Sequence, residues 1–515
     1  MSRQEDDMQR EDHSDQEYQP SDIPDEVLAR FRARVLCPTE AVPAADHRPV
    51  GSTVYRVDRL QVPSVDWARD DVRAWVEGQL GEMGLTAMTP APPRDERLAA
   101  WMRLAEESRE GYGRPLSLRL VHRPDVLAQE PMDAWRALQH LRFTARAAGG
   151  RIEEAVQRFS LEHLLWGADT TIPKPGTEGH GDSAPTAYRG TGRLPVRLLG
   201  RPPFERRQMG SAPPRRPVVA VLDTLLGAHP WLPSTTNNPG NYVVDQTVLT
   251  VPGTSGPPPI GPTEPLTGQL RRHVGHGEFI AGIITQIVPD ATVLSIPVMH
   301  FDGAGTGEDL ADGLAALLGL VVAEQQKPGT GLFVDVLVLA MGYYSEDPLA
   351  AGPNASLFGQ LRSLIDHGVA VVASAGNDAT PRHCYPAAWA LQPGLAMPIV
   401  SVGALNPNGT GAIFSNQADS PAPPPDWVTR WAPGVAITSA FPAINGGYTS
   451  LLEVPALGRQ AFDPDDFSAG FATWDGTSFA AAVYAAELVS RLLAGTLPVD
   501  TIDPKSAIDR MSPLL

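Results

Sequence analysis

The amino-acid sequence predicts an α/β fold in which a parallel sheet carries helices on both faces, preceded by a smaller mixed α/β domain. Two observations lead to this prediction. From residue 217 onward, continuous apolar segments of strand length alternate with segments of helical periodicity. Such strands, separated by helical crossovers, are typical of a parallel sheet that is buried on both faces. Between residues 50 and 166, strand-like alternation and helical spacing are mixed.

Composition divides the chain into four regions. Residues 1–49 begin with a run of Asp, Glu, Gln and Ser and are expected to form an acidic, disordered tail. Residues 50–166 are expected to form the N-terminal α/β domain, and residues 217–515 the large domain. Between them, residues 167–216 are rich in Pro, Gly and Arg, which is typical of a linker or of an arm lying over a neighbouring domain.

In the small domain, the patterns predict two strands and three helices. Asp66 and Asp95 are expected to cap two of the helices, and Gly149 with Gly150 to end the third. As we assign it, the order of elements does not match a βαββαβ arrangement. The expected strands are 54–60 and 116–120, and the expected helices are 66–80, 95–107 and 132–147.

In the large domain, apolar runs predict the strands and amphipathic runs the helices. The expected strands are 217–222, 292–298, 335–341, 370–374 and 399–404, and the expected helices are 308–325 and 357–367. Active sites of such sheets gather at the carboxyl ends of the strands. An insertion over 446–467, rich in Asp, Pro and Gly, is expected to overhang that edge.

Charge and composition exclude several classes of protein. The net charge of −18 argues against a nucleic-acid partner, which requires clustered Lys and Arg. Neither a signal peptide nor an apolar stretch long enough to span a membrane is expected, so the predicted location is cytoplasmic. Cys37 and Cys384 are the two cysteines, and they do not suggest a disulfide framework. The oligomeric state cannot be predicted.

Four short motifs bring catalytic residue types into one order along the chain. Asp223 ends an apolar strand, His276 lies between two glycines, Asn377 follows another strand, and Ser478 precedes a run of strong helix formers. Each motif alone is weak, because a capping Ser or a turn Asn is common. A serine hydrolase needs a nucleophile, a base, a group that orients the base, and donors for the oxyanion. The order Asp, His, Ser is the one found in subtilisin.

Over residues 217–490 the chain resembles the subtilases, the subtilisin-like serine peptidases. The resemblance implies that Ser478 is the nucleophile, His276 its base, Asp223 the residue that orients the base, and Asn377 the oxyanion donor. Glu278 and Phe279 depart from the family pattern after His276, and a carboxylate at 278 could raise the pKa of the base. His273 lacks the flanking glycines and is a poorer candidate for the base.

The resemblance also implies how a substrate binds. A protein or peptide would lie as an extended strand between two edges of the cleft. Ala340, Met341 and Gly342 would form one edge, and Phe301 with Gly303 the other. The segment Ser374, Ala375 and Gly376 would line the substrate pocket, with Tyr343 and Tyr344 near it. No cofactor is expected. A structural calcium ion is compatible with the family, but no site for one can be assigned.

Two questions stay open from the sequence. The expected activity is that of a serine endopeptidase acting on a dedicated intracellular protein or a peptide precursor, and the alternative is a catalytically silent peptide-binding module of the same fold. The N-terminal domain is expected to be a regulatory or recognition domain that stays attached and modulates the protease, and the alternative is a prodomain removed by cleavage. The dibasic pairs Arg206-Arg207 and Arg215-Arg216 are candidate cleavage sites, although exposed loop arginines are the commoner explanation of such pairs.

Overall fold

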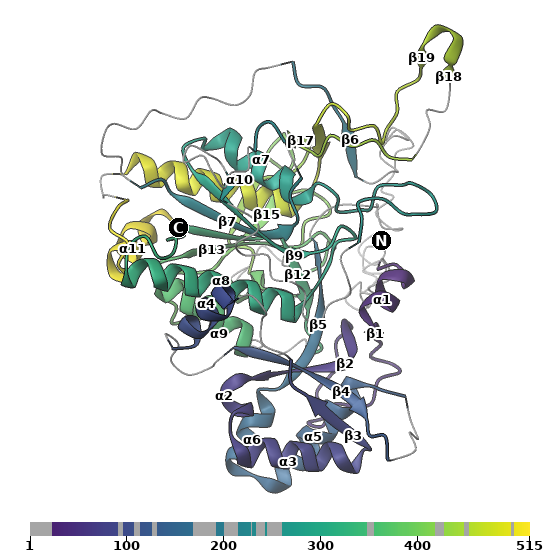
Figure 1. Cartoon of the computed structure of the whole chain (residues 1–515), viewed down its shortest axis with the longest axis vertical. Helices are drawn as coiled ribbons and strands as arrows, with labels where there is room; N and C mark the ends of the chain where they lie inside the picture. Colours follow the sequence, from purple (N-terminus) through teal and green to yellow (C-terminus); the bar gives the residue numbers. More distant parts are fainter. Residues whose placement is uncertain are drawn as a thin grey trace, which may run out of the picture.

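The structure is a computed structural model of the whole chain, and it has the predicted α/β fold with a small domain below a large one (Figure 1). The residues that it describes are 23–90, 96–107, 114–125, 131–167, 192–199, 215–227, 229–232, 243–244, 260–347, 355–417, 427–447, 453–495 and 499–515.

A seven-stranded parallel sheet forms the centre of the large domain, in the order β16-β15-β13-β11-β7-β9-β8. Every residue of β7, β11 and β13 is buried, as expected for strands covered on both faces. The strands are β7 (Val218–Thr224), β8 (Val243–Val244), β9 (Thr292–Met299), β11 (Val336–Leu339), β13 (Ala370–Ser374), β15 (Val400–Leu405) and β16 (Arg430–Pro433).

Helices cover the two faces of this sheet. In Figure 1, α7 (His276–Ile287) and α10 (Thr477–Ala494) lie above it, and α8 (Gly307–Gln326) and α9 (Ala355–Asp366) lie below. Of the helices that the structure describes, only α10 is long and apolar enough to cross a membrane, and 72% of that window is buried within the protein, as in a core helix. The other helices described in this domain are η4 (Ala387–Leu391), η5 (Pro455–Leu457), α11 (Pro504–Met511) and η6 (Ser512–Leu514).

The small domain has the order βαββαβ, and the expectation that it does not match this order was wrong. Its antiparallel sheet runs β5-β2-β4-β3. The two expected strands correspond to β2 and β4, whereas β3 and β5 were not expected, and the additional helix α4 separates β3 from β4. The elements are β2 (Thr53–Pro63), α2 (Ser64–Trp67), α3 (Asp70–Glu82), β3 (Leu85–Met88), α4 (Glu96–Glu107), β4 (Pro115–His122), α5 (Ala134–Ala148), α6 (Gly150–Gln157) and β5 (Ser160–Gly167).

The predicted helix ends are correct only in part. Asp66 lies inside α2, and its carboxylate pairs with Arg158 rather than capping α3. Asp95 lies outside the described residues. Gly149 ends α5 as expected, but α6 begins again at Gly150. A glycine stops a helix because it adopts special backbone angles easily, and that freedom does not prevent a second helix from starting.

Part of the region expected to be a disordered tail is folded. Helix α1 (Asp25–Phe31) and strand β1 (Ala33–Leu36) are ordered, and β1 pairs with β2. Val27 and Phe31 are buried in a cluster that includes Ala304 of the large domain. A few buried apolar side chains are thus enough to order this charged segment. The average composition of residues 1–49 does not show them, so it predicted disorder.

The segment expected to be a linker contains a strand. β6 (Arg193–Pro195) pairs with β20 (Phe471–Trp474), which pairs with β17 (Ile437–Ala440). This supports the interpretation as an arm lying over the large domain. Arg206-Arg207 lies outside the described residues. Arg215 pairs with Asp335 at 2.7 Å and Arg216 with Asp290 at 3.0 Å, so this second dibasic pair is tied to the large domain.

The insertion does not close over the sheet edge where the structure describes it. It carries a short hairpin of β18 (Glu453–Val454) and β19 (Arg459–Gln460), which projects from the body of the molecule at the upper right of Figure 1. The expectation that it overhangs the cleft was wrong for this hairpin. Composition identifies such an insertion, but its direction depends on contacts at its base, such as the hydrogen bond from Gly447 N to Gly268 O (2.8 Å).

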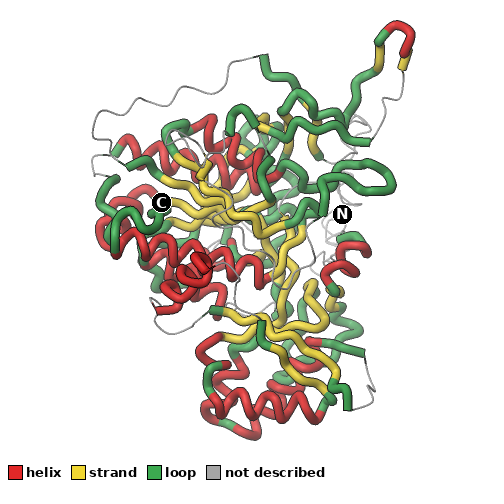
Figure 2. The backbone as a smooth tube through the Cα atoms, viewed as in Figure 1, coloured by secondary structure: helices red, strands yellow, loops and turns green. Residues whose placement is uncertain are grey.

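Strand β5 joins the two domains. It belongs to the sheet of the small domain and also pairs, antiparallel, with β10 (Ala304–Thr306) and β12 (Met341–Tyr344) of the large domain. Strand β14 (Cys384–Tyr385) extends the same sheet beyond β12. Figure 2 shows this continuous column of strands between the two domains.

Candidate active site

Asp223 and His276 form the first part of the site. Asp223 lies near the carboxyl end of β7 and is fully buried, and its Oδ1 accepts a hydrogen bond from the Thr224 N–H (2.7 Å). Its two carboxylate oxygens lie 2.8 and 2.9 Å from Nδ1 of His276. A carboxylate there holds the imidazole in the tautomer with a proton on Nδ1, which leaves Nε2 able to act as a base.

The glycines on both sides of His276 allow this contact. Gly275 has φ +81°, and a Cβ there would lie 2.6 Å from Cδ of Pro442. A Cβ on Gly277 would lie 2.7 Å from the carbonyl oxygen of Thr224. Both positions therefore require glycine, and the resulting close packing of α7 against the end of β7 brings His276 onto Asp223.

Ser478 is the second residue of α10, after Thr477. It is fully buried, and its Oγ donates to the carbonyl of Ala340 at 3.2 Å. The N–H groups in the first turn of a helix are not used by the helix itself and point toward its N-terminus. The nucleophile predicted from the sequence thus lies beside the Ala340 edge, where backbone donors can face a developing oxyanion.

Asn377 lies directly against the start of α10. Its Oδ1 accepts a hydrogen bond from the Thr477 N–H (3.0 Å), and the N–H of the preceding Gly376 donates to Thr477 Oγ1 (3.1 Å). Nδ2 of Asn377 is buried and has no hydrogen-bond partner among the described residues. The amide is therefore fixed through its oxygen, while its donor end is available to a ligand.

The two predicted edges of the cleft are occupied by β5. Met341 pairs with Gly167 and Gly342 with Trp166 on one side. On the other side, the Gly167 N–H donates to the Gly303 carbonyl at 2.9 Å. The neighbouring Phe301 contributes its carbonyl to a hydrogen bond from the His273 N–H (2.9 Å) rather than to the strand.

The predicted catalytic side chains are buried, and β5 ends beside the same edge that Ser478 contacts. Asp223, His276 and Ser478 each have no exposed surface. In this antiparallel pair, β5 runs from Trp166, opposite Gly342, to Gly167, opposite Met341, and the carbonyl of the adjacent Ala340 accepts from Ser478. The C-terminal end of β5 therefore lies one residue along this edge from Ala340, which Ser478 contacts.

Comparison with known proteins agrees with this geometry. The family model described as the subtilase family matches residues 215–494, more than half of the chain. This chain belongs to the subtilase family. It therefore belongs to a family of serine peptidases, and the predicted resemblance is confirmed.

Individual relatives are distant. Subtilisin-like protease 2 of Pseudogymnoascus destructans is 28% identical over 171 residues, which cover 32% of this subtilase and 35% of that protein. The chain thus spans about a third of the length of that curated relative. A solved structure of a cold adapted subtilisin-like serine proteinase aligns over 62% of this chain and 88% of that chain, with 17% identity and a TM-score of 0.35.

The backbone of Ala375 and Gly376 is engaged within the subtilase domain. Ala375 donates to Val402 O (3.0 Å) and accepts from Asn416 Nδ2 (3.0 Å), and Gly376 accepts from the Asn416 N–H (3.0 Å). Ser374 is buried beside them. These groups can form a wall of the substrate pocket, but their backbone hydrogen bonds are used elsewhere, so their role in binding stays a prediction.

The tyrosines that follow the Ala340 edge are packed rather than open. Tyr343 is stacked on His163 of β5, with ring centroids 4.4 Å apart. Tyr344 donates to Asp378 at 2.5 Å. Cys384 is buried beside them, and burial raises the pKa of its thiol, so it is a poor nucleophile.

Glu278 lies one turn into α7 and is buried. Its carboxylate accepts a hydrogen bond from the Gly227 N–H, in the loop after Asp223. Burial raises the pKa of Glu278 to about 7, the nearby Asp223 charge adds to this, and the hydrogen bond from Gly227 opposes it. Glu278 is thus partly protonated near neutral pH, and any effect on His276 stays a prediction.

Two residues that sequence reasoning did not include in the site lie close to it. Arg193, from the arm, is buried and donates to the carbonyls of Arg271, Arg272 and Val274, just before His276. His273, considered only as a rival base, packs with its ring 5.4 Å from that of His276 and 5.7 Å from that of Trp166. No local pattern in the sequence identifies the contacts of Arg193 with residues 271–274 or of His273 with Trp166, because these contacts join distant segments.

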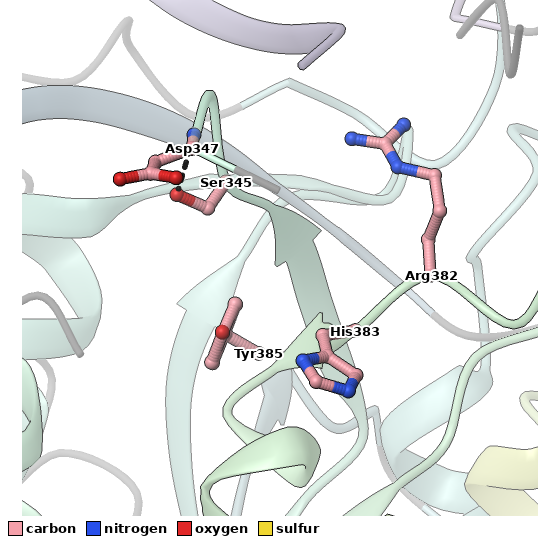
Figure 3. A pocket seen from close by; sticks show the side chains of 5 residues that line it. All are labelled: Ser345, Asp347, Arg382, His383 and Tyr385. Atoms are coloured by element: carbon pink, nitrogen blue, oxygen red, sulfur yellow. Dashed lines mark hydrogen bonds between the residues drawn. The ribbon is translucent and has the colours of Figure 1, made fainter. Parts of the chain in front are cut away.

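Other features lie away from the triad. Figure 3 shows a small pocket lined by Ser345, Asp347, Arg382, His383 and Tyr385. It adjoins the small domain, since Arg382 donates to Ser52 O (2.8 Å) and Arg48 pairs with Asp347 (3.3 Å).

Among the described residues, no group of three or more His, Cys, Asp and Glu side chains is placed to hold a metal ion.

Proposed function

We propose that this subtilase is a serine endopeptidase that cleaves a protein or peptide bound as an extended strand. The observation that carries the proposal is the contact of His276 Nδ1 with both oxygens of Asp223, at 2.8 and 2.9 Å, beside Ser478 at the start of α10. This arrangement fits nucleophilic catalysis by a serine with an oriented histidine base.

The proposed reaction proceeds in two stages. Ser478 Oγ attacks the substrate carbonyl while Nε2 of His276 takes its proton, and Asp223 stabilises the imidazolium that forms. The oxyanion is stabilised by Nδ2 of Asn377 and the backbone N–H of Ser478. His276 then gives the proton to the leaving amine. Water, activated by the same histidine, hydrolyses the acyl-enzyme.

We further propose that the small domain blocks this cleft until the chain is cut beyond Gly167. The position of β5 favours the prodomain-like interpretation, which the sequence had placed second. Contacts other than those of β5 also hold the small domain against the large one. Met102 and Ala105 of α4 are buried in the core of the large domain. Arg114 pairs with Asp312 of α8 at 2.9 Å, and Arg30 with Asp302 at 2.5 Å.

The test compares the wild type with Ser478→Ala by intact-mass measurement and labelling with a fluorophosphonate. We expect the wild type to cut itself within residues 168–216, close to Gly167, and to become labelled, while Ser478→Ala stays a single unlabelled chain of 55.1 kDa. The two fragments should elute together in gel filtration, because the docking contacts are independent of the cut. An intact wild type that labels fully would contradict the blocking role but not the peptidase. Absence of both cleavage and labelling would favour the silent peptide-binding module.

Docking of the small domain is expected to weaken as the pH rises. Glu308, at the start of α8, is 4% exposed and lies 3.9 Å from Arg59 of β2. Burial raises the pKa of Glu308, and the carboxylates of Glu162 and Asp312 raise it further, while Arg59 opposes this. In an undocked chain Glu308 would face water and recover its ordinary pKa. Docking therefore takes up a proton, and its free energy becomes less favourable as the pH rises.

This pH dependence can be measured without catalysis. In the Ser478→Ala chain, amide hydrogen exchange of β5, corrected for the intrinsic rate, should become faster between pH 6 and pH 8.5. Glu308→Gln should flatten the profile, because the side chain no longer titrates. Asp366→Asn, in α9 on the surface of the same domain, serves as the control and should leave the profile unchanged. If the pH dependence of β5 exchange in Glu308→Gln equals that of the parent chain, groups other than Glu308 cause it.

A further inference from the structure

We propose that His273 makes this cleft selective for substrates with glycine at the position held by Gly167. This position lies on the N-terminal side of the bond that Ser478 attacks. The inference rests on the proposed peptidase function and adds a class of substrate to it. We call the surface formed by His273, Met299 and Gly303 the Gly167 subsite.

Strand β5 shows how a chain lies in the cleft. It pairs antiparallel with β10 and β12 at once, and Gly167 is its last residue. The Gly167 N–H donates to Gly303 O (2.9 Å), while Met341 pairs with Gly167 from the other side. A peptide substrate that binds between the same two edges would place one residue where Gly167 lies.

The Gly167 subsite has no room for a side chain. An ideal Cβ on Gly167 would lie 2.5 Å from Cδ2 of His273, closer still to Nε2, and 3.2 Å from Sδ of Met299. The backbone angles of Gly167 are not in the left-handed region that favours glycine. Glycine is thus required here by contact with the imidazole and not by the conformation of the backbone.

The His273 ring cannot move aside easily. Its opposite surface faces Gly303, where an added Cβ would lie 2.7 Å from Cγ of His273 and nearer to other ring atoms. The rings of Trp166 and His276 contact it edge-on, and it has no exposed surface. His273 therefore lies between two glycines, Gly167 at the end of β5 and Gly303 just before β10, within packed aromatic neighbours.

An added methyl group must displace either this ring or the bound strand. Inserting one methylene into a packed site typically lowers stability enough to change an equilibrium about 10- to 100-fold. We therefore expect substrates with alanine at this position to be cleaved about 10- to 100-fold less efficiently than those with glycine.

The experiment uses the full-length wild-type chain and two peptides in competition. One peptide has the sequence of residues 160–171, and the other carries Gly167→Ala. Docking of the small domain lowers kcat/KM for both peptides equally, so their ratio reports the subsite alone. The wild type should prefer the glycine peptide about 10- to 100-fold, and His273→Ala should reduce the preference to within about threefold. A residue that only stabilised the fold would change both rates and leave their ratio unchanged.

Each other outcome is decisive. Equal cleavage of both peptides by the wild type would overturn the selectivity. A preference that persists in His273→Ala would overturn the assignment to His273. If the wild type cleaves neither peptide, the strand-docking measurement alone decides on the Gly167 subsite, and if a fluorophosphonate also fails to label it, the peptidase proposal fails as well.

Strand docking provides that second measurement. In the Ser478→Ala chain, Gly167→Ala should speed amide exchange of β5 about 10- to 100-fold, and adding His273→Ala should restore most of the protection. Gly78→Ala, in α3 of the same domain, is the matched control because a Cβ there meets nothing within 4 Å. Equal exchange in the Gly167→Ala and Gly78→Ala chains would overturn the proposal, even if the His273→Ala enzyme does not fold.

Discussion

Replacement of Ser478 by alanine is expected to abolish turnover, with a loss of about 10⁶-fold in kcat. The nucleophile and its base act as a unit, and in subtilisin removing either one alone costs about as much as removing the whole triad. The hydroxyl of Ser478 lies 3.2 Å from the Ala340 carbonyl at the end of the occupied cleft. Without this hydroxyl, only the oxyanion donors and substrate binding remain to accelerate the reaction.

Two quantities are measured: the extent of covalent labelling by a fluorophosphonate and the rate of peptide hydrolysis. Ser490→Ala is the matched control, because Ser490 lies on the same helix α10 and is exposed. The control should label and turn over as the wild type does. Labelling that persists in Ser478→Ala would sink the assignment of the nucleophile.

Replacement of Asn377 by alanine is expected to lower kcat by about 10² to 10³, which corresponds to about 2.7–4 kcal/mol of transition-state stabilisation. Its Oδ1 is held by the Thr477 N–H at 3.0 Å, so Nδ2 is preset for the oxyanion. KM should change little, since this hydrogen bond matters mainly in the transition state.

Asn377→Asp sharpens the test. It keeps an oxygen that accepts from Thr477 and replaces the donor by a second carboxylate oxygen, whose negative charge also repels the oxyanion, so a loss at least as large as that of Asn377→Ala would assign the effect to Nδ2. Asn408→Ala, an exposed loop amide, is the control. If Asn377→Ala changes KM alone, Asn377 contributes to ground-state binding and not to the oxyanion.

The sequence by itself determined the large domain and the identity of its catalytic side chains. Apolar runs such as 217–222 and 370–374 predict buried parallel strands, because a strand covered on both faces has no polar side. The motifs around Asp223, His276 and Ser478 are local, and their order along the chain is independent of any contact. The structure places Asp223 and His276 in contact, as that order implied.

Only the tertiary structure decided what lies in the cleft. The pairing of β5 with β10 and β12 joins segments more than 130 residues apart, and strand periodicity specifies a face but not a partner. The βαββαβ order of the small domain was missed because the sequence did not indicate β3 and β5 as strands, and because α4, which packs on α8 of the large domain, is inserted between β3 and β4. His273 belongs to the Gly167 subsite because three distant segments pack around its ring, and such packing depends on shape, which no local pattern in a sequence records.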